Sequence, residues 1–170
     1  MNFNELDKSQ KIRNHYTVNE IIDLIGIEKW NNAFKFTCVR NPLDRLYSFY
    51  AFRVKNGRIK NESHLVSFKK WVFYELEERD PLSKKRFNLL PQSDWLIDLQ
   101  NEIRLDFIGR FENVKEDFDR LGRIIPSQKK LSHLNKSPRE QNYKQHYDAE
   151  LKAFVMEYYQ IDIENFKYKI

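Results

Sequence analysis

A strand-to-helix junction at residues 34–50 constrains the fold more than any other segment of this chain. Phe34, Phe36 and Cys38 alternate with other residues at the two-residue period of a β-strand. Pro42 cannot continue a sheet ladder, but its fixed φ suits the first position of a helix. We therefore expect a short buried strand that turns at once into a helix.

The helix after Pro42 is predicted to be amphipathic, with one apolar face against a core. The residues at helical spacing on that face are Leu43, Leu46, Tyr47, Tyr50, Ala51 and Val54. Arg45 and Ser48 are three residues apart and share a different face. From Val54 to His64 the sequence is polar and contains an Asn-Gly pair, so a loop is expected there.

Arg40 stands at the carboxyl end of the expected strand, and Ser48 lies about two turns into the helix. Open α/β sheets bind ligands at the carboxyl ends of their strands. A guanidinium with a hydroxyl close by suits a phosphate dianion. The alternative is an ordinary junction in which Arg40 forms a salt bridge, and spacing alone leaves both interpretations open.

Residues 39–50, V-R-N-P-L-D-R-L-Y-S-F-Y, resemble the 3′-phosphate-binding motif of the carbohydrate sulfotransferase superfamily, in its Golgi-type and small bacterial branch. The resemblance implies that Arg40 and Ser48 hold the 3′-phosphate of the sulfuryl donor 3′-phosphoadenosine 5′-phosphosulfate (PAPS). Further family blocks, in the same order, are resembled by residues 106–114, by residues 131–137 and by the tail, which comprises residues 158–162, Phe166 and Tyr168. The likeness therefore runs from about His15 to the end of the chain.

The resemblance also implies further site residues and partners. The basic loop of residues 129–139 would reach over PAPS, with Lys136 and Ser137 near its phosphates; the alternative is a solvated basic loop. The acceptor would be a hydroxyl compound, with a glycan expected. Arg110 and Glu112 either line the acceptor site or pair with each other.

His15 is the candidate catalytic base, because it is the only histidine in the part of the chain where the family places that group. Transfer to a hydroxyl needs a group that takes its proton, and histidine suits neutral pH. The alternative is a surface histidine beside a helix cap. No metal is expected, since no two histidines have ligand spacing and Cys38 is the only cysteine. Cys38 itself is expected to be a buried, inert thiol.

One part of the family pattern is missing from the sequence. Family members begin with a strand and a lysine-containing, glycine-rich loop that cradles the 5′-phosphosulfate. This chain has 4 glycines, none of which precedes Gly26, and no two lie close together. Such loops need the backbone freedom of glycine. We therefore expect a single N-terminally truncated domain over residues 1–170, with the loop absent or supplied by another chain.

The expected fold class is α/β and helix-rich, with a small parallel sheet. The family would supply a P-loop-kinase-like core, here without its first strand and loop. Further expected elements are a helix capped by Thr17 and Glu20 and ended by Gly26, a strand at residues 107–111 followed by a helix, and a final helix at about 148–159. An exposed sheet edge would permit a homodimer.

Composition excludes fewer functions than the motifs do. The 170 residues carry a net charge of +5, which fits an anionic ligand such as a nucleotide. No apolar span or signal sequence is evident, so a cytoplasmic protein is expected. Three functions stay open: a sulfotransferase, a degenerate homologue that binds the donor without turnover, and a basic interaction module. No nucleic-acid motif supports the third.

Overall fold

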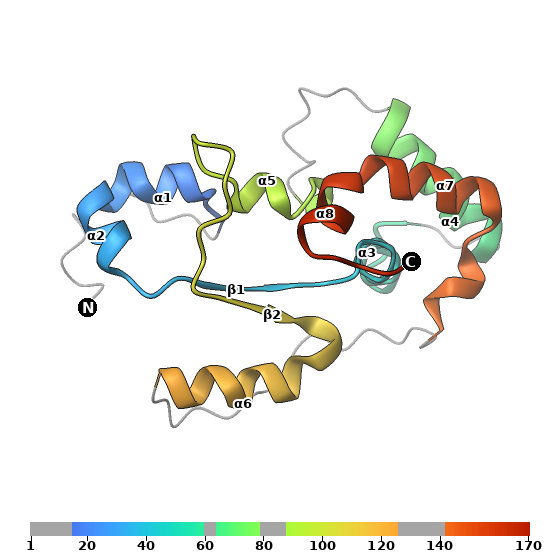
Figure 1. The fold of residues 1–170 in the computed structure, drawn as a ribbon. Coiled ribbons are helices and arrows are strands. Elements are labelled where there is room, and N and C mark those ends of the chain that lie inside the picture. The colour runs from blue at the N-terminus through green and yellow to red at the C-terminus, as the bar shows by residue number, and fades with distance from the viewer. Residues whose placement is uncertain (1–14, 60–63, 79–87, 126–141) are drawn as a thin grey trace.

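The computed structural model describes residues 15–59, 64–78, 88–125 and 142–170, in which helices predominate (Figure 1). The helices are α1 Val18–Ile25, α2 Ile27–Asn32, α3 Pro42–Lys55, α4 His64–Phe73, α5 Ser93–Leu96, α6 Val114–Ile124, α7 Ala149–Tyr158 and α8 Gln160–Asn165. The strands are β1 Phe36–Val39 and β2 Phe107–Arg110. A π-helical turn continues α4 over Tyr74–Glu78, and 3₁₀ turns occupy Phe111–Asn113 and Tyr143–His146.

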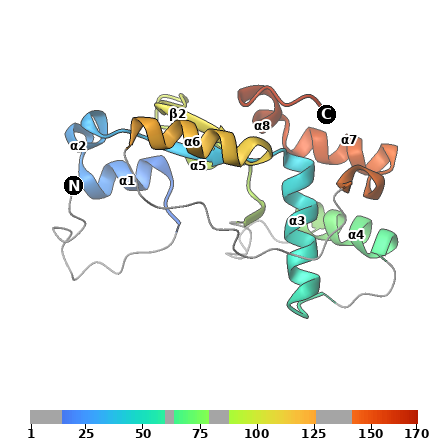
Figure 2. The same ribbon diagram turned by 90° about the horizontal axis from the view of Figure 1, so that it is seen from below.

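The two strands form a parallel pair. Phe36 lies opposite Phe107, and Val39 lies opposite Arg110. Figures 1 and 2 show α6 on one face of this pair and α5 on the other. The expectation of a helix-rich α/β fold with a small parallel sheet is confirmed.

Local signals set the start and the end of α1. The Thr17 N–H donates to Glu20 Oε2 at 2.8 Å, and the Glu20 N–H donates to Thr17 Oγ1 at 3.3 Å. Gly26 follows the helix with a φ of +84°, a conformation that residues with a Cβ rarely adopt. The capping box and the glycine stop are confirmed, whereas α2, which follows directly, was not expected.

The start of α3 is also confirmed. Pro42 occupies the first turn, and the side chain of Asn41 caps the helix. Asn41 Oδ1 accepts hydrogen bonds from the backbone N–H groups of Leu43 at 3.0 Å and Asp44 at 3.4 Å. The helix continues to Lys55, two residues into the segment expected to be a loop.

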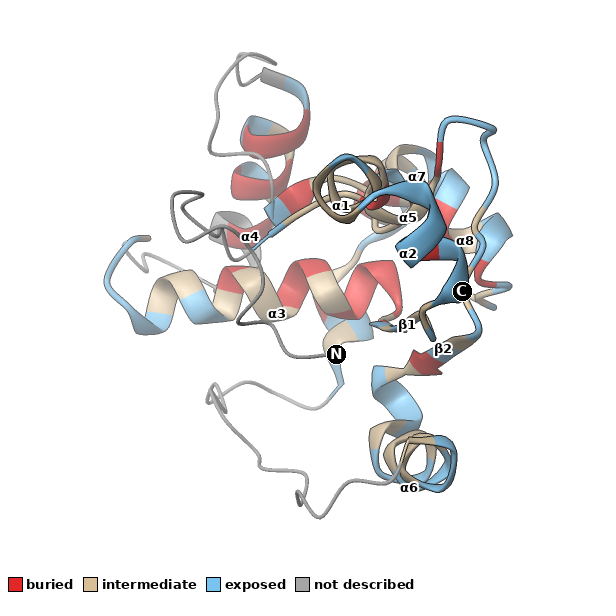
Figure 3. Ribbon diagram, turned by 90° about the vertical axis from the view of Figure 1, so that its left-hand side faces the viewer, coloured by how far each residue is buried: buried red, intermediate tan, exposed pale blue. Residues whose placement is uncertain are grey.

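The hydrophobic core lies beyond the carboxyl end of β1, between α3, α4 and α7, rather than on the sheet (Figure 3). Its buried members are Leu43, Leu46, Tyr47, Tyr50, Phe68, Trp71, Val72, Leu76, Leu89, Leu151, Val155 and Tyr159. Phe68 is central, with its ring centroid 5.3 Å from Tyr47 and 5.1 Å from Tyr50. This packing fixes α3 and therefore the junction that precedes it.

The expectation of a buried first strand is wrong for most of its residues. Val39 is buried, but Phe36 is 53% exposed, and Cys38 is also exposed. Within the described residues the sheet has only two strands, so neighbouring strands do not shield these side chains. Partial burial and the Glu112 and Asp117 carboxylates raise the pKa of the Cys38 thiol, which keeps it protonated at neutral pH.

The helix expected at about residues 148–159 is confirmed as α7, whereas the short helix α8 that follows it was not expected. Asp148 caps α7, as its Oδ1 accepts the N–H of Leu151 at 2.8 Å. The helix ends at Tyr158, and α8 begins at Gln160. Along the described ranges of the chain, we find no helix with the length and apolar character needed to cross a membrane.

A turn after α5 leads to an acid-stability prediction. Asp98 is buried and accepts hydrogen bonds from the N–H groups of Gln100 and Glu102, at 2.9 and 3.1 Å, and from Arg104 Nε at 2.5 Å. Burial by itself would raise the pKa of Asp98, but these hydrogen bonds lower it below its usual value. Its stabilisation is therefore complete above the unfolded-state pKa of about 3.9 and is lost as the pH falls toward the folded-state pKa.

Replacing Asp98 with asparagine should thus lower the free energy of unfolding at neutral pH, and the difference from wild type should shrink as the pH falls below about 4. Urea unfolding at a series of pH values measures this. Asp119→Asn, at an exposed position of α6, is the matched control. A difference that is independent of pH would contradict the prediction.

Candidate functional site

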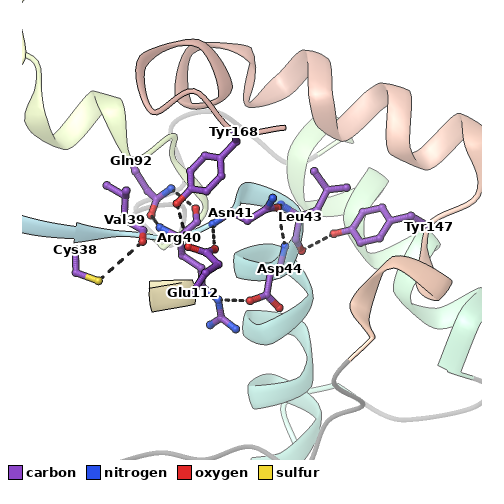
Figure 4. A network of polar contacts seen from close by, with 10 residues as sticks. All are labelled: Cys38, Val39, Arg40, Asn41, Leu43, Asp44, Gln92, Glu112, Tyr147 and Tyr168. Atoms are coloured by element: carbon purple, nitrogen blue, oxygen red, sulfur yellow. Dashed lines mark hydrogen bonds and ion pairs between the residues drawn. The ribbon is translucent and has the colours of Figure 1, made fainter. Parts of the chain in front are cut away.

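Arg40 lies where β1 ends and α3 is about to begin, and the parallel register determines its neighbours (Figure 4). Val39, the last residue of β1, pairs with Arg110, so the two residues that follow β1 come beside Phe111 and Glu112. Two contacts follow this alignment. The Arg40 guanidinium lies over the Phe111 ring at 4.2 Å, and the Asn41 N–H donates to Glu112 Oε1 at 2.5 Å.

The Arg40 side chain is 15% exposed and is held from two directions. Arg40 Nε donates to Asp44 Oδ2 at 2.6 Å, and the guanidinium lies over the Phe111 ring. Nη2 is buried and has no hydrogen-bond partner among the residues that the structure describes. Buried donors of this kind are normally satisfied. The arrangement leaves a cationic N–H donor that can bind an anion.

Both sequence interpretations of Arg40 are therefore compatible with the structure. The salt bridge exists, as an i,i+4 pair with Asp44. This salt bridge uses Arg40 Nε and leaves Nη2 without a partner among the described residues. Ser48 is four residues beyond Asp44 and half-buried, so it lies one turn further along the same face of α3. Arg40, Asp44 and Ser48 thus follow one another along this face.

A side-chain amide holds the backbone of Arg40. The Arg40 N–H donates to Gln92 Oε1 at 2.9 Å, and Gln92 Nε2 donates to the Arg40 carbonyl at 2.9 Å. Glu112, which accepts the next N–H, also accepts the Tyr168 hydroxyl at 3.4 Å. Burial raises the pKa of Tyr168, and Glu112 adds to that effect, so the phenol stays protonated and can donate.

Two tyrosines before α7 border the same junction. The Tyr147 hydroxyl donates to the Leu43 carbonyl at 2.8 Å, and burial raises the pKa of Tyr147. Partial burial also raises the pKa of Tyr143, with further contributions from the carboxylates of Asp44 and Glu112. Both phenols therefore stay protonated at neutral pH beside Arg40 and Asp44.

His15 contacts α5. Its exposed ring meets Trp95 edge-on, with the centroids 6.0 Å apart. Trp95 belongs to α5, which begins immediately after Gln92, so His15 lies against the helix that follows the residue bonded to the Arg40 backbone. The role of His15 as a base stays a prediction. Lys136 and Ser137, with their loop of residues 129–139, lie outside the described residues.

Arg110 and Glu112 form no ion pair with each other in the structure, so that one of the two alternatives is wrong. The Arg110 guanidinium lies over the Tyr168 ring at 4.7 Å and donates through Nη2 to the Phe166 carbonyl. Glu112 faces the N-terminus of α3 instead. Arg110 thus connects β2 to the C-terminal segment, and Glu112 connects the turn after β2 to the start of α3 and to Tyr168. Both residues therefore have structural roles.

Sequence reasoning did not find the partners of Arg40. Asp44 had a usable signal, because it is four residues from Arg40 at the start of a helix. Phe111 would have followed from the strand register, which the sequence does not reveal. Gln92 lies 52 residues away along the chain, and no local pattern connects it to Arg40.

The described residues also form an apolar pocket of about 410 Å³ between the strands and α6. Phe36, Cys38, Phe107, Phe118 and Leu121 are among the residues that line it, whereas Arg40 and Ser48 do not. The pocket is therefore separate from the candidate anion site. Within the described part of the chain, no group of three or more His, Cys, Asp or Glu side chains is placed to hold a metal ion.

Comparison with known proteins adds one finding. Residues 2–169 match the model of a family described as the sulfotransferase family. No curated protein matches the chain, and no solved structure matches it. The match spans nearly the whole sequence and includes the Arg40 junction, the second strand and the C-terminal helices.

Proposed function

This chain belongs to the sulfotransferase family, and from that premise we propose that it binds PAPS at the end of β1 and transfers the sulfuryl group to a hydroxyl of a carbohydrate acceptor. In this proposal Arg40 and Ser48 hold the 3′-phosphate. Family membership supports a nucleotide donor and a hydroxyl acceptor in general. The assignment of the two residues rests on the motif and on the geometry of Arg40.

The observation that carries the proposal is the buried Nη2 of Arg40, which has no partner among the described residues. Phosphate oxygens are strong acceptors for guanidinium donors, and charge-assisted hydrogen bonds are about twice as strong as neutral ones. Asp44 and Phe111 both contact the guanidinium and restrict it, so little side-chain entropy remains to be lost on binding. The Ser48 hydroxyl, further along the same face, would supply a second donor.

PAPS, when bound, supplies the sulfuryl group that the acceptor oxygen attacks, and adenosine 3′,5′-bisphosphate (PAP) leaves. The bond from sulfur to the 5′-phosphate oxygen breaks as the new sulfur–oxygen bond forms, and the proton of the acceptor hydroxyl passes to a base. We assign that base to His15, whose exposed ring can accept a proton. Lys136 and Ser137 would add donors to the phosphates.

A second candidate is a homologue that binds PAP or PAPS without turnover. It applies if the 170 residues act alone, because their 4 glycines are dispersed and none forms part of a glycine-rich loop. A loop of that kind would bring several backbone N–H groups to the 5′-phosphosulfate. The two candidates share the 3′-phosphate site and differ only in the chemical step.

Calorimetric titration with PAP and with adenosine 5′-monophosphate tests the shared site. The two nucleotides differ by the 3′-phosphate, so PAP should bind at least about tenfold more tightly if Arg40 donates charge-assisted hydrogen bonds to that group. Equal affinities, or no binding of PAP, would refute the proposed site. PAP release from PAPS in the presence of glycan acceptors then separates the two candidates, since the degenerate homologue binds but releases no PAP.

A further inference from the structure

Arg40 has a backbone environment that the strand pairing does not explain. The last paired residue of β1 is Val39, so Arg40 lies one residue beyond the described ladder. Its N–H and its carbonyl are nevertheless both hydrogen-bonded, at 2.9 Å each, to the single side-chain amide of Gln92. A carboxamide has the same donor and acceptor as a peptide group. Gln92 therefore takes the place of a neighbouring strand at this one residue.

Gln92 is in turn fixed by a fully buried carboxylate. The Gln92 N–H donates to Asp162 Oδ2 at 2.7 Å, and Gln92 Nε2 lies 3.3 Å from the same oxygen. The other oxygen, Oδ1, accepts the Ser93 N–H at 2.7 Å. Asp162 has 0% exposure, so these hydrogen bonds form away from bulk water. The carboxylate thereby holds both the backbone and the amide of Gln92.

The chain of contacts from Asp162 to Gln92 to Arg40 links α8 to the end of β1. Both ends of the Gln92 amide are used, with the carbonyl oxygen on the Arg40 N–H and the nitrogen shared between the Arg40 carbonyl and Asp162. An amide held in this way cannot rotate without losing hydrogen bonds in a mostly buried place, which is costly. The backbone of Arg40, and hence the direction of its guanidinium, is set by residues far from it in sequence.

We propose that Gln92, anchored by Asp162, is a positioning residue that orients Arg40 toward the 3′-phosphate. This inference rests on the proposed function, because it takes the 3′-phosphate of PAP or PAPS to be the anion that Arg40 binds. Gln92 does not touch the nucleotide in this arrangement. It acts through Arg40 by preventing the backbone at the strand end from shifting.

The direct test replaces Gln92 with methionine, which has a similar length and shape but neither hydrogen-bonding group. Residues that orient a ligating side chain are worth about 10- to 100-fold in affinity at metal sites, and we expect PAP to bind about tenfold more weakly here. Amide hydrogen exchange at Arg40 should also become faster, because its N–H loses its acceptor. Gln160→Met is the matched control, since Gln160 is exposed and bonds only to Glu164 among the described residues.

A merely structural role for Gln92 would give a different result. Loss of stability alone would weaken the apparent affinity for PAP only in proportion to the fraction of chains that is unfolded without ligand, and the dissociation constant of the folded chains would stay unchanged. A double-mutant cycle with Arg40→Lys adds a second distinction. If Gln92 acts through Arg40, the effect of Gln92→Met should be smaller in the Arg40→Lys background than in the wild type, whereas independent effects would add.

The outcomes separate this inference from the proposed function. If wild type does not prefer PAP to adenosine 5′-monophosphate, the proposed 3′-phosphate site is wrong, and the inference falls with it. If wild type binds PAP and Gln92→Met binds it equally well, the site stands, and the positioning role is wrong. Unchanged hydrogen exchange at Arg40 in the variant would likewise overturn the positioning role.

Discussion

Replacing Arg40 with alanine should weaken PAP binding by roughly 10- to 150-fold, the equivalent of about 1.5–3 kcal/mol for hydrogen bonds to a charged group. The variant removes the buried Nη2 donor and the positive charge at the end of β1. Asp44, which pairs with Arg40 Nε, would then face the 3′-phosphate without that guanidinium. Calorimetric titration of the variant with PAP measures the effect.

Two further variants make the Arg40 result specific. Arg123→Ala removes the same charge from an exposed position in the last turn of α6 and should leave PAP affinity nearly unchanged. Arg40→Lys keeps the charge but loses the planar group that bonds to Asp44 while stacking on Phe111, so its affinity should be intermediate. Equal losses in Arg40→Ala and Arg123→Ala would indicate a general charge effect instead of a site.

Replacing Phe68 with alanine should cost about 3–5 kcal/mol of unfolding free energy, the usual range for a large aromatic side chain in a core. Phe68 has 0% exposure and packs against the rings of Tyr47, Tyr50 and Tyr147 at centroid distances of 5.1–5.3 Å. A void in this cluster would loosen α3 against α4 and the segment before α7. Chemical denaturation followed by circular dichroism measures the change.

Phe36→Ala is the matched control for the Phe68 variant. Phe36 is 53% exposed on β1, and surface substitutions typically change stability by about 0.5 kcal/mol or less. A similar loss of stability in both variants would show that the sheet, and not the cluster between α3, α4 and α7, carries the core. The expected contrast would confirm that the strands contribute little burial of their own.

Several features of the fold could be predicted because their causes are local. Thr17 and Glu20 form the capping box, and Gly26 ends the helix that follows. Pro42 begins α3 as its fixed φ requires. Each signal lies within a few residues of its structural effect, so periodicity and capping chemistry are enough to place the element. The resemblance that marked Arg40 and Ser48 is local in the same sense.

The surroundings of these local elements could not be predicted in the same way. The burial of the first strand was misjudged because alternation in sequence does not tell how many strands will cover it, and Cys38 is exposed as a result. The helix at about residues 148–159 was found, but the short helix α8 that packs after it, Gln160–Asn165, was not expected. In both cases the packing of other elements determines the outcome.

The sequence by itself determined where the strand ends, where the helix begins and which arginine stands between them. Only the tertiary structure decided what surrounds Arg40: Phe111 over its guanidinium, Gln92 on its backbone and Asp162 behind Gln92. Gln92 is 52 residues from Arg40 along the chain, Phe111 is 71 residues from it, and Asp162 is 70 residues from Gln92. Hydrogen bonds and ring contacts act over a few ångströms in space, so residues so distant in sequence become partners only when the elements have packed.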